Sequence, residues 1–128
     1  LEEQVQTTPD FAPQIHISTC YLTAAESPLQ RDAVEIRIRD NGIGIPESQQ
    51  NQLFDPFFTT KPVGKGTGLG LSISYQIVVE RHQGQLYYKS TPNDGTEFVI
   101  VIPVHPHHSV FTLDSHSQKK SNVLLTAV

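Results

Sequence analysis

The chain has 128 residues and a formal net charge of −4 at pH 7, which fits one domain with a modest core and excludes a basic surface for nucleic acid. Its single cysteine, Cys20, excludes an intrachain disulfide framework and fits a reducing compartment. The longest apolar run, at 98–104, is too short to cross a bilayer and no signal peptide is recognisable, so we expect a cytoplasmic segment without membrane contact.

The first part of the chain predicts a short helical segment and two strands. A helical remnant ends near Thr7, and prolines mark the loop that follows. Apolar and polar residues alternate over 15–21 and again over 34–39, as they do in half-buried strands. Because a polar connection at 23–32 joins these two segments, we expect them to form an antiparallel pair.

A glycine motif follows the second strand directly, with the sequence Asp40-Asn41-Gly42-Ile43-Gly44-Ile45-Pro46. Glycines let the backbone approach a flat ligand closely, and the Asp40 carboxylate can accept a hydrogen bond from an exocyclic amine such as that of adenine. The alternative for these residues is a tight turn, since Asp and Asn-Gly are ordinary turn residues. Pro46 fits the first turn of a short helix at 47–53.

Three phenylalanines come next, within five residues: Phe54, Phe57 and Phe58. They predict an anchor that ties the hinge of a moving loop to the core, and the alternative is a plain aromatic core patch. Lys61 and Lys65 follow, and each can neutralise phosphate charge as a point cation. The alternative for either one is a solvated surface lysine.

Glycine then recurs at every second position of 64–70, immediately before a segment with helical character. This spacing predicts a pliable loop whose backbone N–H groups close over phosphate, with the free N–H groups of the next helix directed at the same place. A Walker loop is excluded because Lys65 is followed by Gly66, and a dinucleotide fingerprint is excluded because one residue separates Gly68 from Gly70. The alternative is a glycine-rich linker.

An amphipathic helix is expected to begin near Leu69 and to end at Gly84. Its expected core contacts are Leu71, Ile73, Ile77 and Val78. Arg81 and His82 lie near its negative dipole end, where a cation is favourable. Two further strands, at 86–89 and 96–102, are expected to form a hairpin around the turn sequence at 92–95.

The periodic pattern is lost after Pro103, so a flexible tail is expected over 105–128. The histidines at its start offer a metal site as the alternative, but no acidic or thiol residue adjoins them. At the other end the chain has no initiator methionine, and Leu1 has no capping residue before it. We therefore expect a piece of a longer protein, whose upstream part can carry a membrane anchor.

Together the motifs resemble a known family. D-N-G-I-G-I-P, F-D-P-F-F-T-T-K and G-K-G-T-G-L-G-L, in this order and spacing, are similar to the first glycine box, the phenylalanine box and the second glycine box of sensor histidine kinases. These kinases belong to the superfamily of gyrase, Hsp90, histidine kinase and MutL ATPases (GHKL). Gly84-Gln85-Leu86 and Gly95-Thr96-Glu97-Phe98 resemble the end of the same domain, so the resemblance covers about 13–104.

The resemblance implies an α+β fold of the Bergerat type: a two-layer α/β sandwich with a mixed, mainly antiparallel sheet that helices cover on one face. Residues 1–104 would be a partial ATPase domain and 105–128 its flexible tail. Asp40 would bind the adenine amino group, Thr96 would share its water network, and 59–68 would form a lid over the phosphates. The implied nucleotide-binding residues are Asp40, Gly42, Ile43, Gly44, Lys61, Lys65, Gly66, Thr67, Gly68, Leu69, Gly70 and Thr96.

The resemblance also implies the reaction of the intact protein. ATP would phosphorylate a histidine on a separate dimerisation domain, and the phosphate would pass to an aspartate of a response regulator. The family's N box, whose Asn and acidic residues hold Mg²⁺, has no counterpart here, and residues 1–5 resemble only its last turns. No histidine has the phosphoacceptor pattern either, so we assign no catalytic residue or metal ligand and expect weak or no Mg²⁺-ATP binding by this chain alone.

Two alternatives remain open from the sequence. One is a protein-serine kinase or anti-sigma factor of the same superfamily, against which the long phenylalanine box argues. The other is a non-catalytic interaction module that keeps the fold without turnover.

Overall fold

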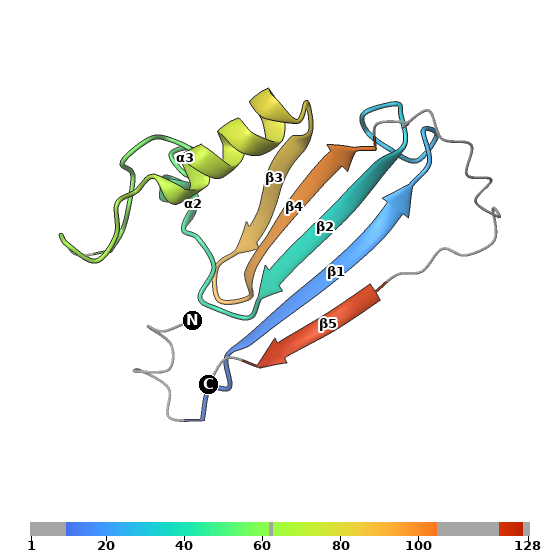
Figure 1. The fold of residues 1–128 in the computed structure, drawn as a ribbon. Coiled ribbons are helices and arrows are strands. Elements are labelled where there is room, and N and C mark those ends of the chain that lie inside the picture. The colour runs from blue at the N-terminus through green and yellow to red at the C-terminus, as the bar shows by residue number, and fades with distance from the viewer. Residues whose placement is uncertain (1–9, 62, 105–120, 127–128) are drawn as a thin grey trace.

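The computed structural model describes residues 10–61, 63–104 and 121–126, and Figure 1 shows their arrangement. Five strands form one sheet in the order β3-β4-β2-β1-β5, and each neighbouring pair is antiparallel. The elements are β1 (Gln14–Leu22), β2 (Ala33–Asp40), α2 (Glu47–Gln50), α3 (Gly70–Tyr75), the π-helix η1 (Gln76–Arg81), β3 (Gln85–Thr91), β4 (Gly95–Pro103) and β5 (Ser121–Thr126). The expected α+β fold is confirmed, and among the described strands the sheet is purely antiparallel rather than mixed.

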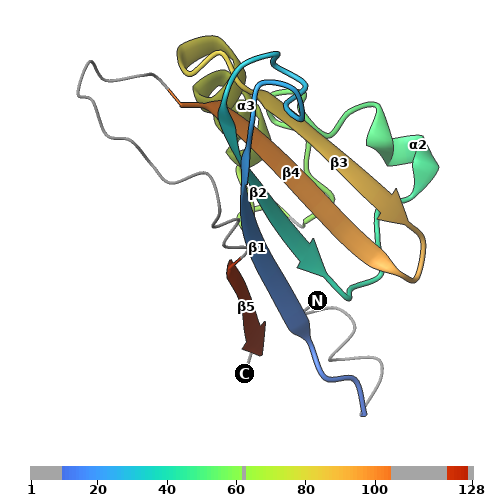
Figure 2. The ribbon, with the colours of Figure 1, turned by 90° about the vertical axis from the view of Figure 1, so that its right-hand side faces the viewer.

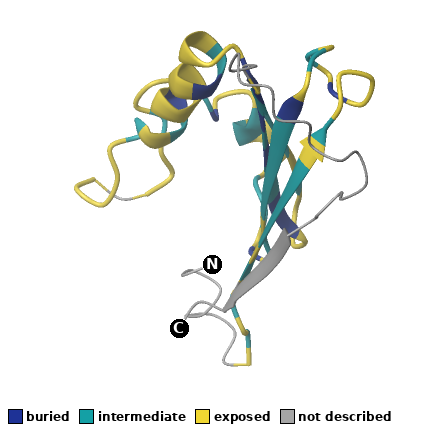
Figure 3. Cartoon of the chain, turned by 45° about the vertical axis from the view of Figure 1, so that its right-hand side comes forward, coloured by how far each residue is buried: buried dark blue, intermediate teal, exposed yellow. Residues whose placement is uncertain are grey.

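The helices lie on one face of the sheet, as expected and as Figure 3 shows, and Figure 1 shows them over its β3 side. Aromatic rings join the two layers there. The ring centroid of Phe54 lies 5.5 Å from that of Tyr75 in α3 and 6.0 Å from that of Tyr88 in β3. Tyr88 lies 6.3 Å from Phe98 in β4, so the contact continues along the sheet. Tilted rings at these separations stabilise the layer contact beyond the area that they bury.

A second cluster forms on the opposite face of the sheet. Ala33, Val99 and Val101 are fully buried there, and Leu22, Leu29 and Tyr87 pack around them. Leu29 belongs to the β1–β2 connection, which Figure 2 shows passing over this end of the sheet. Farther along the same face, Arg37 forms ion pairs with Glu35 at 2.6 Å and with Glu97 at 3.2 Å. The β1–β2 connection therefore covers this face at one end, and farther along the face carries paired charged side chains.

The long helix departs from the expected one in two respects. Leu71 is half-buried and Val78 is buried, as expected, but Ile73 and Ile77 are 47% and 41% exposed. Residues two positions apart project about 200° apart around a helix, so Leu71 and Ile73 cannot both face the sheet. The helix also widens into η1 before it ends, where His82 Nδ1 lies 2.7 Å from the Ile77 carbonyl oxygen. That contact agrees with the expected capping role of His82.

The C-terminal segment also differs from expectation. Residues 121–126, expected to lie in a flexible tail, form β5 along the outer edge of β1. The apolar residues Val123 to Leu125 suit a strand, and β1 supplies a free row of backbone partners. The expected helical remnant at 1–7 and the histidines at 105–108 lie outside the described residues. In the part of the chain that is described, no helix has the length and apolar character needed to span a bilayer.

The β1–β2 connection is held by a hydrogen bond whose strength depends on pH. The Tyr21 hydroxyl donates to Asp32 Oδ2 at 2.6 Å, and Ala24 N donates to the other carboxylate oxygen at 2.8 Å. The bond to Asp32 raises the pKa of Tyr21 above its ordinary value. Because deprotonation is harder in the folded chain, the stabilisation is complete below the pKa of an unfolded tyrosine, about 10, and is lost as the pH rises through the higher folded value.

We therefore expect Tyr21→Phe to lower the free energy of unfolding at neutral pH by about 0.5 kcal/mol, a small loss because Tyr21 is 46% exposed. The difference between the two proteins should begin to shrink above pH 10 and vanish once the pH exceeds the raised pKa of the folded chain, as measured by urea unfolding across a pH series. Tyr75→Phe is the control, since its hydroxyl has no hydrogen bond within the described residues. A constant difference between wild type and Tyr21→Phe at all pH values would contradict this account.

Candidate functional site

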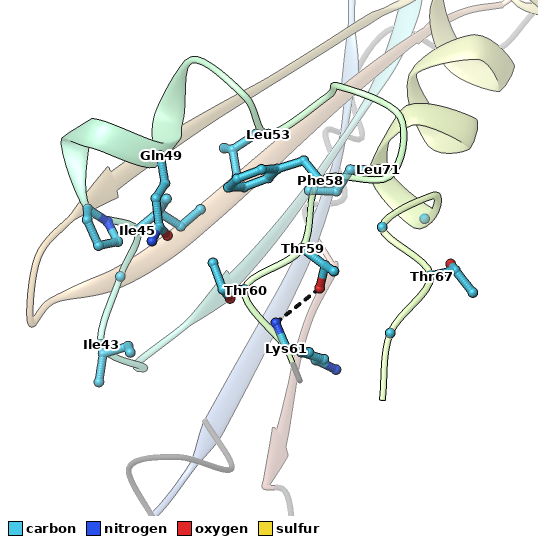
Figure 4. Close-up of a pocket in the computed structure, with 15 residues that line it drawn as sticks. Ile43, Ile45, Gln49, Leu53, Phe58, Thr59, Thr60, Lys61, Thr67 and Leu71 are labelled. Carbon is cyan, nitrogen blue, oxygen red and sulfur yellow. Dashed lines mark hydrogen bonds between the residues drawn. The ribbon is translucent and has the colours of Figure 1, made fainter. Parts of the chain in front are cut away.

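A cavity of about 550 Å³ opens between the helical layer and the loops at one end of the sheet. Figure 4 shows Ile43, Ile45 and Gln49 along one side of it and Thr67 on the other, with Thr60 and Lys61 between. The lining residues come from the segment after β2, α2, the 58–61 and 66–68 segments and the start of α3. They are Ile43, Gly44, Ile45, Pro46, Gln49, Leu53, Phe58, Thr59, Thr60, Lys61, Gly66, Thr67, Gly68, Gly70 and Leu71.

Asp40 lies outside the cavity and supports the segment 43–45 that forms one of its walls. The β2–β4 ladder ends with Arg39 opposite Glu97, and the Asp40 carboxylate then replaces the missing strand partner. Its Oδ1 atom accepts hydrogen bonds from Gly42 N at 2.8 Å and from Thr96 N at 3.3 Å. The carboxylate thereby joins the end of β2 to the start of β4 and sets the course of the segment that lines the cavity.

A hydroxyl pair extends the same connection. Thr96 is buried, and its Oγ1 lies 2.8 Å from Ser90 Oγ in β3. Ser90 Oγ in turn accepts a hydrogen bond from Ile45 N at 2.7 Å. The Ile43 carbonyl accepts another, from Asn93 N in the β3–β4 turn, at 2.7 Å. The cavity wall at 43–45 is therefore held against the hairpin at both of its ends.

Two glycines of this site occupy conformations that other residues rarely adopt. Gly44 has φ +72° and Gly68 has φ +68°, both in the left-handed region. A Cβ atom at Gly44 would meet the carbonyl oxygen of Thr91, and one at Gly68 would meet the backbone of Phe57. Each glycine thus allows one wall of the cavity to approach a neighbouring backbone.

The other end of the cavity is more exposed and carries a positive charge. Lys61 is the one ionisable residue among the described residues that line the cavity, and its backbone N–H donates to Thr59 Oγ1 at 3.1 Å (Figure 4). Gly70 and Leu71, at the start of α3, also line this end. A cation beside exposed backbone N–H groups at a helix start favours an anion.

The structure brings most of the sequence-predicted residues together. Seven line the cavity: Ile43, Gly44, Lys61, Gly66, Thr67, Gly68 and Gly70. Asp40, Gly42 and Thr96 lie outside the lining but form the hydrogen-bonded support behind Ile43 and Gly44. Lys65 and Leu69 are not in the lining. The Thr67 side chain points away from Thr60 and Lys61 in Figure 4.

Some lining residues were not predicted. Pro46, Gln49 and Leu53 follow helical spacing on one face of α2 and the turn after it, a signal that the sequence does contain. Ser90, which supports the wall without lining the cavity, carries no such signal, because its role depends on the pairing of β3 with β4. The prediction for the phenylalanines was partly wrong. Phe54 and Phe58 pack inward, whereas Phe57 is 73% exposed with φ +67°.

The described residues do not form a divalent-metal site at the cavity. No aspartate or glutamate is among the described residues that line it. Over the described chain, no group of three or more His, Cys, Asp or Glu side chains is placed to hold a metal ion. Mg²⁺ prefers carboxylate oxygens, so these residues alone do not fit it.

Comparison with known proteins identifies the family. The model of the histidine kinase-, DNA gyrase B-, and HSP90-like ATPases, HATPase_c, matches residues 5–106. The chain belongs to this family. The matched residues belong to the catalytic HATPase_c domain, as the glycine and phenylalanine boxes of the sequence predict.

The similar proteins are sensor kinases. Signal transduction histidine-protein kinase AtoS of Escherichia coli (strain K12) is 48% identical over 71 residues, 56% of this chain and 11% of that protein. Sporulation kinase E of Bacillus subtilis (strain 168) is 46% identical over 76 residues, 59% of this chain and 10% of that protein. A solved structure, mycobacterial sensor histidine kinase MprB, aligns at 35% identity with a TM-score of 0.48 over 59% of this chain and 50% of that chain. The chain thus spans about a tenth of the length of the two curated kinases.

The close backbone approach at Gly44 predicts a steep cost for a single methyl group. Gly44→Ala should lower the free energy of unfolding by at least about 2 kcal/mol, because the new Cβ meets Thr91 and φ is positive. Gly70→Ala lies in α3 and has no atom near its added Cβ, so it should lower the free energy of unfolding by no more than about 0.5 kcal/mol or raise it. Chemical unfolding of both variants gives the comparison. Equal effects would show that the Gly44 contact does not constrain the fold.

Proposed function

We propose that this chain is the ATP-binding catalytic domain of a two-component sensor histidine kinase and that the cavity beside Ile43 and Gly44 receives adenine nucleotide. The observation that carries the proposal is the Asp40 carboxylate, which Gly42 N and Thr96 N hold behind the Ile43–Ile45 wall of a cavity whose other end has Lys61. The resemblance of the three sequence boxes to sensor kinases and the AtoS match support it.

The end of the cavity beside Ile43 and Gly44 would recognise adenine because Asp40 offers it a hydrogen-bond acceptor and no donor. Asp40 Oδ1 is occupied by two backbone N–H groups, while Oδ2 has no hydrogen bond within the described residues. A carboxylate oxygen can only accept, so it fits the exocyclic amine of adenine and disfavours a carbonyl at the same ring position. Ile43, Gly44 and Ile45 would provide the flat apolar wall beside the ring.

The phosphate end would attract charge without binding it rigidly. Lys61 supplies the positive charge, and the backbone of 66–68 and the start of α3 supply N–H groups. Phosphoryl transfer depends mainly on positioning and on stabilising negative charge, which these groups can contribute. Lys65 would reach the phosphates only if the 63–68 segment moved inward, since it is exposed and outside the lining.

The intact protein would add the remaining parts. We propose that an upstream N box supplies the Mg²⁺ ligands and that a dimerisation domain supplies the phosphoacceptor histidine, from which phosphate passes to a response regulator. In support, the half-buried residues Ile17, Ile36 and Ile38 line the helix-side face of β1 and β2, where no described helix packs extensively. An upstream helix would cover this apolar face. Its use of ATP would place the domain in the cytoplasm.

The polarity argument predicts a change of base preference. In Asp40→Asn the amide oxygen can still accept from Gly42 N and Thr96 N, which leaves an NH₂ group facing the base. We expect ADP affinity to fall about 10- to 100-fold, because two donors then oppose each other. IDP, which has a carbonyl at that position, should bind the variant better than the wild type does.

Isothermal calorimetry or fluorescence competition with both nucleotides measures this preference. Asp55→Asn is the matched control, since Asp55 is exposed and, within the described residues, its carboxylate does not support the cavity wall through hydrogen bonds as Asp40 does. If Asp40→Asn and the wild type show the same ADP-to-IDP ratio, the chain would instead be a module that keeps the fold without reading adenine through Asp40.

A second expectation concerns the chain by itself. Because the described cavity lining has no carboxylate for Mg²⁺, Mg²⁺ should not strengthen the binding of ATP, and no phosphohistidine should form. Calorimetry with Mg²⁺ or with EDTA, and a phosphohistidine assay, check these points. Micromolar affinity that depends on Mg²⁺ would contradict the expectation and point to metal ligands elsewhere in the chain.

A further inference from the structure

β5 is attached to the rest of the molecule in an unusual way. It lies beyond residues 5–106 that match the family, and it packs against β1 without an extensive contact to another described helix or strand. The 16 residues 105–120 connect it to the end of the domain. Crossing β2 and β1 to that edge takes about 15 Å, whereas such a segment can span about 50 Å. The covalent connection alone therefore does not hold β5 in place.

The pairing register shows which backbone groups β5 covers. Gln14 uses its carbonyl toward the β2 side, where it accepts a hydrogen bond from Asn41 N. Backbone groups alternate between the two neighbours along an antiparallel strand, so Ile15, Ile17 and Thr19 direct theirs toward β5. Their partners are Leu125, Val123 and Ser121 respectively. Removing β5 would leave the N–H and C=O groups of these three β1 residues unpaired.

The β1 edge has the properties of a surface that pairs with other strands. β1 has nine residues, contains no proline or charged residue, and places Ile15 and Ile17 on its helix-side face. The opposite edge of the sheet differs, because β3 contains Lys89 and η1 packs beside it. β5 is shorter, with six residues, and Lys119 and Lys120 precede it in the sequence. Short strands and flanking charges are the means by which proteins prevent edge-to-edge association.

We infer that β5 masks a homotypic pairing surface on β1, and that a chain without β5 pairs through β1 with a second copy of itself. A second β1 can take the place of β5 because both run antiparallel to β1, and antiparallel pairing of two identical strands is compatible with a twofold axis. The interface would be the backbone edge of Ile15, Ile17 and Thr19. This inference is independent of the proposed nucleotide binding.

Deletion of residues 121–128 tests the inference directly. The full chain should sediment as a monomer and the deleted chain as a dimer at the same concentration, with circular dichroism verifying that both are folded. A synthetic peptide of residues 121–128, added in excess, should return the deleted chain to a monomer. Ser18→Lys in the deleted chain should also prevent dimerisation, because it places like charges on both paired strands. A folded deleted chain that stays monomeric would overturn the inference.

Two modified peptides distinguish backbone pairing at the β1 edge from non-specific association of the peptide with the chain. N-methylation of Val123 removes the N–H that pairs with Ile17, whereas N-methylation of Leu124 affects an N–H directed away from β1. Only the peptide methylated at Leu124 should return the deleted chain to a monomer, and its affinity for that chain should lie within about threefold of that of the unmodified peptide. Equal potency of the two peptides would exclude the edge as the binding surface.

The same pair of positions keeps the test valid if the deleted chain does not fold. In the full chain, Val123→Pro removes the inward N–H, and Leu124→Pro removes the outward one, which an edge strand tolerates. Val123→Pro should raise the dimer fraction and speed the amide exchange of Ile15, Ile17 and Thr19 at low concentration about tenfold or more, and Leu124→Pro should do neither. Unchanged exchange and a monomeric Val123→Pro chain would refute the masking role.

Discussion

The site depends on one interaction: the Asp40 carboxylate accepts backbone hydrogen bonds at the point where the pairing of β2 with β4 ends. β2 and β4 stay paired up to Arg39 opposite Glu97, and the chain then diverges to enclose a cavity. Without a partner, Thr96 N would be a buried unsatisfied donor, which costs about 1–3 kcal/mol. Asp40 satisfies it and Gly42 N together. The same side chain therefore stabilises the end of the sheet, and under the proposed function its second oxygen would also accept a hydrogen bond from the base, which would couple stability to recognition at this position.

From this point the two ends of the cavity differ in rigidity. The wall at Ile43–Ile45 is held by the β3–β4 hairpin through Ser90 and Asn93, and the close approach of Gly44 to Thr91 leaves no room for a side chain. The opposite end has exposed residues, such as Lys61 and Thr67. Segments of low local stability are those that move when a ligand binds. Under the proposed function, the wall at Ile43–Ile45 would form a rigid base pocket and the end near Lys61 would adapt to the phosphates.

Sequence patterns predicted most of this architecture because the responsible signals are local. The alternation at 15–21 and 34–39, the turn at 92–95 and the three boxes each lie within a few residues, and the structure has them as two paired strands, a hairpin and the cavity walls. The predictions were wrong where distant parts of the chain decide the outcome. β5 forms because β1 offers an edge, which no pattern at 121–126 reveals. The support of Ile45 by Ser90 likewise depends on a strand register.

The exposed apolar side chains of the 57–63 segment have a thermodynamic consequence. Phe57 is 73% exposed and Val63 is fully exposed, although both would be expected to avoid water. Any ligand that draws this segment inward removes their surface from solvent along with its own. Association would then show a heat-capacity decrease larger than the apolar area of the ligand accounts for, and its enthalpy would become steadily more favourable as the temperature rises.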